Sequence, residues 1–459
     1  MPKFNLKKGY NLNLEGKPID EIIEVSSPDI IKVDPNHYKY IKPKLLVKVG
    51  DSVKVGSPLF YDKNNPDINH ASPCSGKIKN IEYGERRKIL GVDIENDKEY
   101  NQIELKFREK LLSLSSIPSL DKESTKKIIN ESGMWPLIRQ RPFSKIADIN
   151  SSPKSIFISM TPTYPLAANQ AFVLENSNNG DGFIEGIDAL SNLTDGNINV
   201  ILSEDQDPSL LDTIDKVKIH YFSGPHPSGN VGVHIHYIDP ISSKEDTVWY
   251  VTPQDVLKIG KVFLDAKIEK RKIITMGGPG CKSPSYLKIY EGTPISHLNE
   301  VRELEIDQSC TLISGDVLSG THINIDDTLD FYDESFTILN NKEDRYFLGW
   351  LLPGFKNFTL TNTYVSKLLN DNNRIDHNML NGSKRAIIPM GLWEKMLPMD
   401  LLPNFIIRSI LAKDIEDMER LGIYECSSED FALCALVCQS KIEVSQIIQD
   451  GLDLMYEEG

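Results

Sequence analysis

The chain has 459 residues, of which 40% are apolar and 25% charged, and its 66 acidic residues against 51 Lys and Arg give a net charge of -15. This length exceeds one ordinary hydrophobic core and predicts roughly three or four domains, while the apolar content excludes a largely disordered chain. The negative charge disfavours binding to nucleic acid or to anionic lipid surfaces.

The N-terminal stretch MPKFNLKKGYNLNLEGKP is polar and lacks the apolar core of a signal peptide, so we expect a cytoplasmic protein. Apolar runs such as Phe347 to Leu352 and Phe405 to Ile407 are far shorter than the ~18 residues needed to cross a bilayer. We therefore expect no membrane span. In a reducing compartment the six cysteines are expected to be thiols or ligands rather than disulfides.

The first predicted module is all-β. The segment Leu45 to Gly84 alternates apolar and polar residues in short strands separated by Gly, Pro, Asp and Asn turns. Its half-repeats, VKVGDSVKVGSPLF and ASPCSGKIKNI, resemble the barrel-sandwich hybrid fold of lipoyl and biotinyl carrier domains. Those carriers are modified on a hairpin lysine, where this chain has Lys63. The sequence around Lys63 departs from the carrier motif, so we interpret the module as structural, with a lysine-modified carrier as an alternative.

The middle of the chain has the pattern of an α/β domain. Two apolar runs, Ser155 to Met160 and Asn199 to Asp205, are typical of buried parallel strands. The stretch TPQDVLKIGKVFLDAK then predicts a helix of about fifteen residues, with Thr252 as its cap, Pro253 at its first position and Asp255 completing a capping box. This helix leads into the strand KIITM.

From Arg271 to about Leu339, strands alternate with Gly turns, as in a small α+β module. The sequence GGPG at 277–280 lacks the frame of a phosphate loop and is interpreted as a turn. Beyond Lys384 the chain is predicted to be helical. Its segment CSSEDFALCALVC, with a capping box at Ser427 and Asp430, would place Cys434 and Cys438 at i and i+4 on one helix face.

Several landmarks follow one another in a specific order: KKGYNLNLEGKP at 7–18, ASPCSGKI at 71–78, GMWPLIRQRPFSK at 133–145, FSGPHPSGNVGVHIH at 222–236, ISGDVLSG at 313–320, GWLLPG at 349–354 and RAIIPMGLWEKMLPMDLLP at 385–403. Over nearly the whole chain, their order and spacing resemble those of the NqrA family. Members of this family are subunits of the sodium-translocating NADH:quinone reductase. That family is also distantly similar to the flavin-binding subunit of respiratory complex I and to the RnfC protein of the Rnf complex.

This resemblance implies an α/β and α+β multidomain fold. A barrel-sandwich hybrid is expected over residues 1–110, a Rossmann-like α/β domain over 111–265, and a β-grasp module of the soluble-ligand-binding type over 266–340. A connecting segment and a helical domain would then occupy 341–459.

The resemblance also implies a peripheral protein on the cytoplasmic face of the bacterial inner membrane, not catalytic alone. Its partners would be the NqrB to NqrF proteins of the complex, chiefly the membrane-embedded NqrB. The complex couples electron transfer from NADH to quinone with Na+ export. Its FAD, FMN, riboflavin and iron–sulfur centres would belong to those partners. The stretch Met390 to Phe405 is a candidate contact with membrane partners, although it also fits an ordinary helical core.

The glycine-rich flavin loop of the redox-active relatives is missing. That loop resembles G-x-x-G-x-G-G-A-G-F-P, in which successive glycines let the backbone wrap a flavin phosphate. The corresponding residues here run from Gly133 to Phe143, and only the first glycine remains. Bulky side chains would fill the phosphate space, and Pro136 and Pro142 offer no N–H donors. We predict neither FMN nor NADH at this place.

The iron–sulfur motif of the Rnf relative, C-x-x-C-x-x-C-x-x-x-C-P, is also incomplete. Aligning its last two cysteines with Cys434 and Cys438 places its first two on Ser428 and Phe431. A [4Fe-4S] cluster uses four thiolates, and this frame supplies two. Cys426 lies outside the frame. We therefore expect buried, unliganded thiols, no metal and no cofactor bound by this chain.

The altered loop carries two arginines between aromatic residues. A quinone headgroup could stack on such aromatic rings while an arginine donates to its carbonyl oxygen. The candidate quinone contacts are Trp135, Arg139, Arg141, Phe143 and Lys145. The alternative is that this loop only packs against a helix or a partner protein.

Three histidines suggest a zinc site as another alternative. His234 and His236 alternate with apolar residues on a predicted strand, which would point both imidazoles to one face, and His226 lies in the preceding turn. Nothing nearby supplies a general base in a pattern such as H-E-x-x-H. We interpret the histidines as structural or interface residues and keep an independent zinc enzyme as the rival hypothesis.

Overall fold

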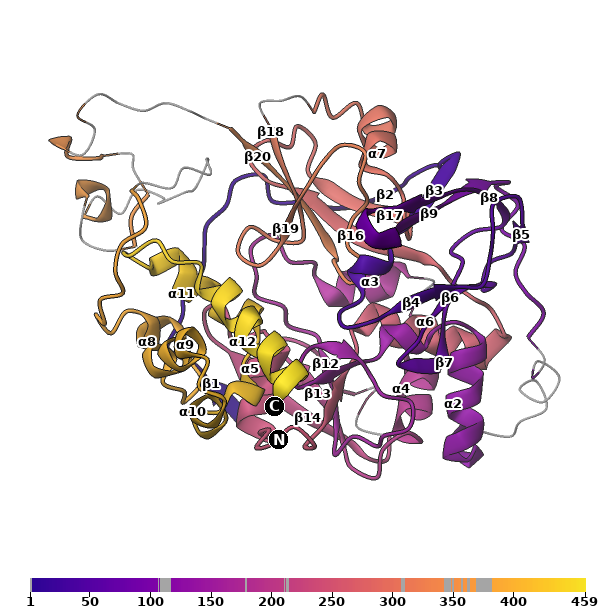
Figure 1. The fold of residues 1–459 in the computed structure, drawn as a ribbon, viewed down its shortest axis with the longest axis horizontal. Helices are drawn as coiled ribbons and strands as arrows, with labels where there is room; N and C mark the ends of the chain where they lie inside the picture. The colour runs from indigo at the N-terminus through magenta and orange to yellow at the C-terminus, as the bar shows by residue number, and fades with distance from the viewer. Residues whose placement is uncertain are drawn as a thin grey trace.

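The computed structural model describes residues 2–105, 107, 117–177, 180–209, 211, 214–306, 310–341, 348, 351–355, 358–360, 364–368 and 382–459, so part of the landmark at 349–354 lies outside the described residues. Its strands form sheets of seven, six, four and three strands, and its C-terminal part is helical (Figure 1). The predicted multidomain fold is confirmed. None of the helices in the described ranges combines the length and apolarity that a bilayer crossing requires.

Two small antiparallel sheets build the N-terminal module. One has the order β3 (Ile30–Val33), β9 (Ile89–Asn96), β8 (Gly76–Tyr83) and β5 (Ser52–Val53). The other has the order β4 (Pro43–Leu45), β6 (Pro58–Asp62) and β7 (Asn65–Ala71). Lys63 lies in the turn between β6 and β7, as the carrier comparison predicts.

The seven-stranded sheet forms the centre of the α/β domain. Its order is β1 (Lys3–Asn5), β14 (Val217–Ser223), β13 (Ile198–Leu202), β12 (Ile156–Ser159), β15 (Val248–Tyr250), β10 (Arg139–Arg141) and β11 (Lys145–Ile146). The first five strands are parallel, whereas β10 is antiparallel to β15 and β11 to β10. The parallel strands predicted at Ser155 to Met160 and at Asn199 to Asp205 are therefore confirmed.

Alternation along β12 separates the two faces of this sheet. Ile156 and Ile158 belong to the hydrophobic cluster with helices α4 (Phe183–Ser191) and α6 (Pro253–Asp265). Phe157 belongs instead to the cluster with α5 (Val231–Ile238) and the C-terminal helices. Successive side chains of a strand point to opposite faces, so each layer of helices covers one face. The remaining helices of this region are α2 (Lys122–Glu131) and α3 (Gln170–Asn176).

Helix α6 begins as predicted. The Oγ1 atom of Thr252 accepts a hydrogen bond of 3.3 Å from the backbone N–H of Asp255, and Pro253 occupies the first helical position. These contacts satisfy the first turn and fix the entry of the chain into the helix. The predicted cap is confirmed, and the helix has 13 residues.

The six-stranded sheet forms the module after the α/β domain. Its order is β19 (Thr321–Ile323), β18 (Cys310–Ser314), β20 (Ser335–Asn340), β16 (Arg271–Gly277), β17 (Ser285–Tyr290) and β2 (Ile19–Glu24), with α7 (Ile295–Arg302) packed on it. Strands β1 and β2 thus leave the N-terminal module and join the two other sheets. The domain division at residues 110, 265 and 340 stays a prediction.

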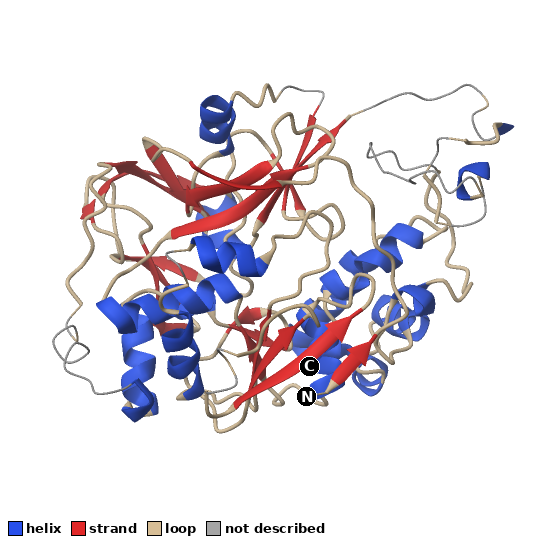
Figure 2. Ribbon diagram, turned by 180° about the vertical axis from the view of Figure 1, so that it is seen from behind, coloured by secondary structure: helices blue, strands red, loops and turns tan. Residues whose placement is uncertain are grey.

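Helices form the C-terminal part, which lies beside the seven-stranded sheet in Figures 1 and 2. Its large apolar side chains form one cluster with Phe157, Phe222 and Tyr250 of that sheet. This shared core joins the C-terminal part to the α/β domain. The helices are α8 (Trp393–Met396), α9 (Pro403–Ala412), α10 (Ile415–Arg420), α11 (Ala432–Val437) and α12 (Val444–Glu458).

Candidate functional site

A cavity of about 190 Å³ lies where the α/β domain, the six-stranded module and the C-terminal part meet. Residues after β12 and β15 and residues at the start of α5 and α6 line one side of it. In open α/β sheets, ligands bind outside the carboxyl ends of parallel strands, which is this position. The cavity is therefore the candidate functional site.

The side chain of Arg139 forms one wall of the cavity. Its guanidinium carbon lies 4.5 Å from the centroid of the Tyr250 ring and 4.4 Å from that of the Tyr332 ring. The two rings hold the guanidinium by cation–π contacts, and we call Arg139, Tyr250 and Tyr332 together the Arg139 clamp. No residue in the described part of the chain forms a hydrogen bond or an ion pair with this guanidinium. Its N–H donors are therefore available to an acceptor in the cavity.

The carboxyl groups of Asp316, Asp333 and Glu334 form another part of the cavity wall. Burial, and then the nearby Asp330 carboxylate, raises the pKa of Asp333 to about 7, and the Ser314 hydroxyl donates a 2.5 Å hydrogen bond to it. Burial also raises the pKa values of Asp316 and Glu334. Desolvation disfavours the charged form of a carboxyl group. The wall thus carries less negative charge near neutral pH than its composition suggests.

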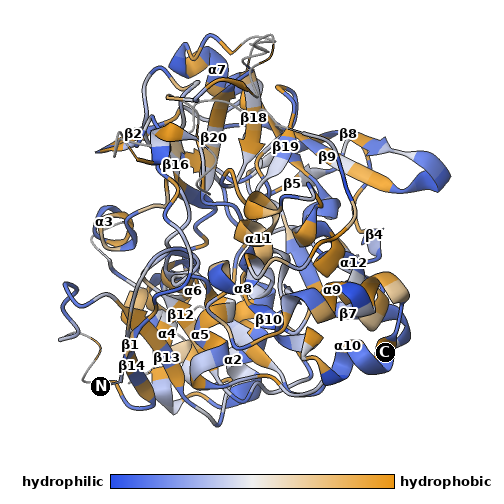
Figure 3. Cartoon of the chain, turned by 90° about the vertical axis from the view of Figure 1, so that its left-hand side faces the viewer, coloured by the Kyte–Doolittle hydropathy of each residue, from blue (hydrophilic) through white to orange (hydrophobic). Residues whose placement is uncertain are grey.

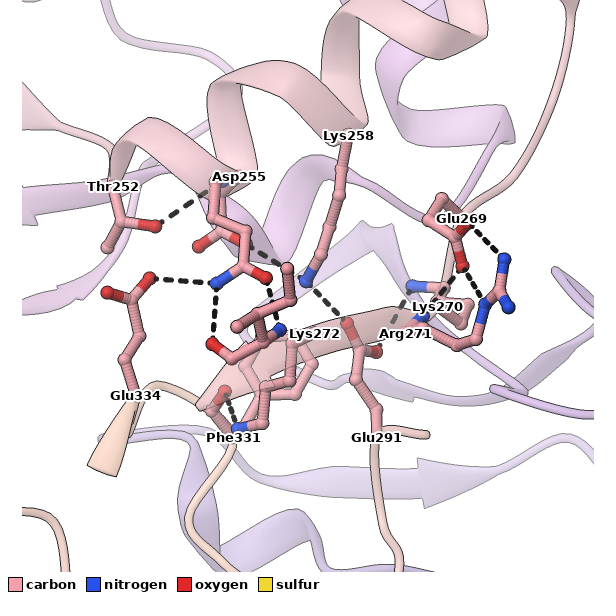
Figure 4. A network of polar contacts seen from close by, with 12 residues as sticks. Thr252, Asp255, Lys258, Glu269, Lys270, Arg271, Lys272, Glu291, Phe331 and Glu334 are labelled. Carbon is pink, nitrogen blue, oxygen red and sulfur yellow. Dashed lines mark hydrogen bonds and ion pairs between the residues drawn. The ribbon is translucent and has the colours of Figure 1, made fainter. Parts of the chain in front are cut away.

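Buried lysines hold the two loops around Arg139, and Figure 4 shows the contact of Lys272 with Phe331. The Lys272 ammonium donates hydrogen bonds to the backbone carbonyls of Asp330, Phe331 and Asp333, at 3.1, 3.2 and 2.8 Å. These bonds fix the loop that carries Tyr332. The Lys270 ammonium donates to the carbonyl of Gly133 at 3.2 Å, at the start of the loop that leads to Arg139.

A direct contact joins the same two loops. The Tyr332 hydroxyl donates a 2.8 Å hydrogen bond to the carbonyl of Pro136. The buried ion pair between Lys258 and Glu291, at 3.0 Å, ties α6 to the six-stranded module beside them. Fully satisfied buried polar groups rigidify their surroundings. The clamp is therefore built before any ligand arrives.

Of the five predicted quinone contacts, only Arg139 lines the cavity. Trp135 is fully buried, donates from its indole nitrogen to the Ala147 carbonyl at 2.8 Å and packs edge-on against Trp249. Arg141 is 2% exposed and pairs with Glu429 at 2.5 Å. Both side chains are buried, and their contacts are with other residues of the protein.

Phe143 and Lys145 face the C-terminal part of the chain. The Phe143 ring lies edge-on to Tyr40, Tyr424 and Tyr456. The Lys145 ammonium lies 5.1 Å from the centroid of the Tyr456 ring. The loop that would wrap a flavin phosphate in the relatives thus holds packed side chains and the short strand β10.

The cysteine segment folds differently from its prediction in two respects. The Ser427 side chain forms no cap hydrogen bond, so the predicted capping box is wrong. Helix α11 ends at Val437, and Cys438 is its C-cap with an extended backbone, so Cys434 and Cys438 do not share a helix face. Ser428 and Phe431 lie in a preceding 3-10 helix.

The thiols of this segment are buried. Burial raises the pKa values of Cys426 and Cys434, and the Cys434 sulfur lies 3.7 Å from the carbonyl of Trp393. Within the described ranges, no group of three or more His, Cys, Asp or Glu side chains could hold a metal ion. A high thiol pKa disfavours the thiolate that metals bind.

Acidic residues of the same segment connect it to the α/β domain. Glu429 pairs with Arg141, and Asp430 accepts a 3.0 Å hydrogen bond from the Asn230 side chain. Glu425 pairs with His236 of α5. These contacts join the cysteine segment to the α/β domain.

Three family models match consecutive parts of the chain. Residues 4–97 match the NqrA N-terminal barrel-sandwich hybrid domain, 120–268 the NqrA second alpha/beta domain, and 273–324 the NQRA C-terminal domain. The NqrA protein of the Na(+)-translocating NADH-quinone reductase from Tolumonas auensis is 33% identical over 457 residues, covering 99% of this chain and 100% of the relative. The corresponding protein of Histophilus somni strain 2336 is 34% identical over 468 residues, with the same coverage.

The chain belongs to the NqrA family. The matches span the three predicted modules up to residue 324, and the two relatives extend the similarity over nearly the whole chain. Among solved structures, a chain of the NAD+-reducing [NiFe]-hydrogenase in the H2-reduced state aligns at 9% identity with a TM-score of 0.38, covering 77% of this chain and 65% of that chain. That similarity is too weak to carry an argument.

In this member of the NqrA family, the predicted histidine strand is wrong, because His234 and His236 lie on helix α5. His234 is fully buried, and its Nε2 lies 2.8 Å from the carbonyl of Ser228. Burial lowers the pKa of His234 to about 3 and that of His226 to about 4. His236 pairs with Glu425 instead. The three histidines therefore have separate structural partners.

Sequence reasoning missed Tyr250, Tyr332 and Glu429, which complete the cavity around Arg139 in this NqrA family member. Tyr250 offered one signal, since it lies in the apolar stretch from Val248 to Val251 just before the Thr252 cap. Tyr332 and Glu429 come from other parts of the chain. Nothing in the local sequence around them indicates that they meet Arg139.

Proposed function

We propose that the chain is a peripheral docking component of the Na+-translocating NADH-quinone reductase, without a flavin or an iron–sulfur cluster of its own. Full-length similarity to NqrA proteins of that complex carries the proposal. The complex couples electron transfer from NADH to quinone with Na+ export. The chain would sit on the cytoplasmic face of the bacterial inner membrane, chiefly against the membrane-embedded NqrB, and would not be catalytic alone.

The side chains of the loop from Gly133 to Phe143 support a protein without a flavin. Trp135 and Arg141 occupy the interior beside the strand ends, and Pro136 and Pro142 lack the N–H donors that cradle a phosphate. The position of the lost cluster carries Ser428 and Phe431 instead of two thiolates. Together these substitutions remove both kinds of electron-carrier ligand.

Exposed apolar side chains support the docking role. Of the seventeen exposed large apolar side chains in the described part of the chain, ten lie between Leu348 and Leu411. Phe405 and Leu411 on α9 are 59% and 57% exposed, and Ile388 and Met390 precede α8. Contiguous exposed apolar surface marks interaction sites on soluble proteins. We propose that the described residues from Leu348 to Leu411, the apolar docking region, contact the membrane partners.

A binding assay tests this docking role. Complex from cells that lack the chain, immobilised through a tag on another component, should bind the purified full-length chain. Phe405→Ser together with Leu411→Ser should weaken this binding at least about tenfold. The control Val301→Ser changes an exposed apolar residue on α7, outside the apolar docking region, and should bind like the original chain. If the double variant bound as tightly as the original chain, α9 would not be part of the docking surface.

A contribution to quinone binding is the second proposed function, and the Arg139 clamp favours it. A quinone carbonyl can accept hydrogen bonds from the unpaired guanidinium, while Phe157 and Val251 supply apolar wall. Arg139→Lys removes the fixed fork of donors and should weaken binding of a short-chain ubiquinone to the full-length chain about tenfold. Lys145→Met, outside the cavity, should have no effect. Unchanged binding by the Arg139 variant would exclude quinone from this cavity.

A further inference from the structure

The hairpin of β8 and β9 extends beyond its own sheet. Strand β5 pairs with β8 only at Gly76 and Lys77, and β3 pairs with β9 only from Val92 to Glu95. The β8–β9 pairing continues outward to Tyr83 and Ile89. Figure 3 shows this hairpin projecting from the body with a hydrophilic end. Its outer part is a two-stranded arm.

The turn at the end of the arm uses unfavourable residues. The Lys88 N–H donates a 3.0 Å hydrogen bond to the Glu85 carbonyl, which closes a turn with Arg86 and Arg87 at its centre. Both arginines have positive φ, +52° and +60°. Tight hairpin turns with two positive φ values favour Asn-Gly, because other L-residues are strained there. Strained residues that local propensity does not explain are candidates for a functional role.

The cations at the tip have no partner among the residues that the structure describes. Arg86, Arg87 and Lys88 are exposed, and their side chains form no hydrogen bond or ion pair with any residue that the structure describes. Elsewhere some exposed cations are paired, such as Lys98 with Asp29. From residue 77 to residue 88 the arm carries five Lys and Arg against two Glu, in a chain with a net charge of -15. Tyr83, the first residue of the tip, is 54% exposed.

We propose that the tip of this arm, Tyr83 to Lys88, docks on an acidic protein surface of a neighbouring component of the complex. The inference rests on the proposed function, since it requires a complex. Opposite potentials steer two proteins together and fix their register. A protein surface fits better than a lipid surface, because the tip holds its cations in a fixed turn and has no aliphatic side chain to insert. The arm is separate from the apolar docking region and would give the assembly a second contact.

Replacing the strained residues by their favoured counterparts provides the test. The variant R86N/R87G should have an unchanged or higher melting temperature, because Asn-Gly relieves the turn. Its affinity for the immobilised complex lacking this chain should fall about tenfold or more at low salt. The variant R86K/R87K keeps the charges and should retain most of the affinity. Raising the salt concentration should lower the affinity of the original chain for the complex towards that of R86N/R87G.

The outcomes separate this inference from the proposed function. Failure of the original chain to bind the complex would contradict the docking role itself. If the original chain binds and R86N/R87G binds equally well at every salt concentration, the arm is not a docking element. Binding of the original chain to phosphatidylglycerol vesicles that R86N/R87G loses, with unchanged affinity for the complex, would assign the arm to lipid and overturn the proposal.

Discussion

The guanidinium of Arg141 and the carboxylate of Glu429, 2.5 Å apart, join the α/β domain to the C-terminal part of the chain. Arg141 is 2% exposed, whereas the Glu429 side chain is 40% exposed. The Nη2 atom makes this contact, whereas the Nε and Nη1 atoms of Arg141 have no hydrogen-bond partner within the described residues. Glu429 is therefore the main counter-charge of a buried cation, in the segment where a relative carries cluster cysteines.

Removal of this counter-charge should destabilise the protein. Glu429→Ala leaves the Arg141 cation buried and unpaired, which should lower the free energy of unfolding by about 1–3 kcal/mol. Urea unfolding at neutral pH measures the change. Glu416→Ala, which breaks an exposed pair with Arg420, serves as the control and should have no measurable effect. Equal stability of the two variants would show that the ion pair does not hold the domains together.

Lys272 should stabilise the wall of the cavity. Lys272→Met removes three hydrogen bonds to backbone carbonyls and should lower the free energy of unfolding by about 2–4 kcal/mol. Hydrogen exchange should also become faster in the loop around Tyr332. Lys79→Met on the exposed face of β8 is the matched control. Unchanged exchange around Tyr332 would mean that Lys272 does not position this loop.

The pH dependence of stability should report on Asp333. Its folded pKa is raised from 3.8 to about 7, so the stability that its proton contributes is complete below about pH 4 and is lost as the pH rises through about 7. Asp333→Asn stays neutral throughout. Relative to the original chain, this variant should therefore gain about 2–3 kcal/mol between about pH 5 and pH 8. Asp327→Asn, at an exposed turn, should show no such trend, and a flat difference for Asp333→Asn would contradict the raised pKa.

The cysteines should be dispensable for the iron content of the complex. Cys434→Ala and Cys438→Ala each remove a buried thiol that packs as a small apolar group, so a stability loss of about 1–2 kcal/mol is expected. Assembled complex carrying both substitutions should retain its full iron content by metal analysis. A loss of iron in step with the substitutions would restore the cluster interpretation.

Local sequence patterns predicted the elements that carry a local signal. Thr252 and Pro253 define the start of α6, because a helix cap is a contact between near neighbours. The apolar run at 156–159 forms a buried strand, because an unbroken apolar run is typical of a strand covered on both faces. The stretch Val231–Ile238 misled the prediction. Its alternating apolar residues suggest a strand, yet it is a short helix buried on several sides, for which periodicity is ambiguous.

Pairing between residues far apart in the chain could not be predicted from the sequence. Arg139 lies on β10, which pairs with the nearby β11 and also with β15, more than one hundred residues later in the chain. The tyrosines that hold Arg139 come from that strand and from another sheet module. Of the site, the sequence alone could therefore indicate the loss of the flavin loop and the importance of its arginines, but not which arginine faces a cavity.

The central claim is that this chain docks within the complex and holds no electron carrier. Its most direct test is the visible absorption spectrum, together with flavin and iron analysis, of the full-length chain purified from its native host. We predict a colourless protein with neither flavin nor iron in stoichiometric amount. One flavin or one iron–sulfur cluster per chain would contradict the claim.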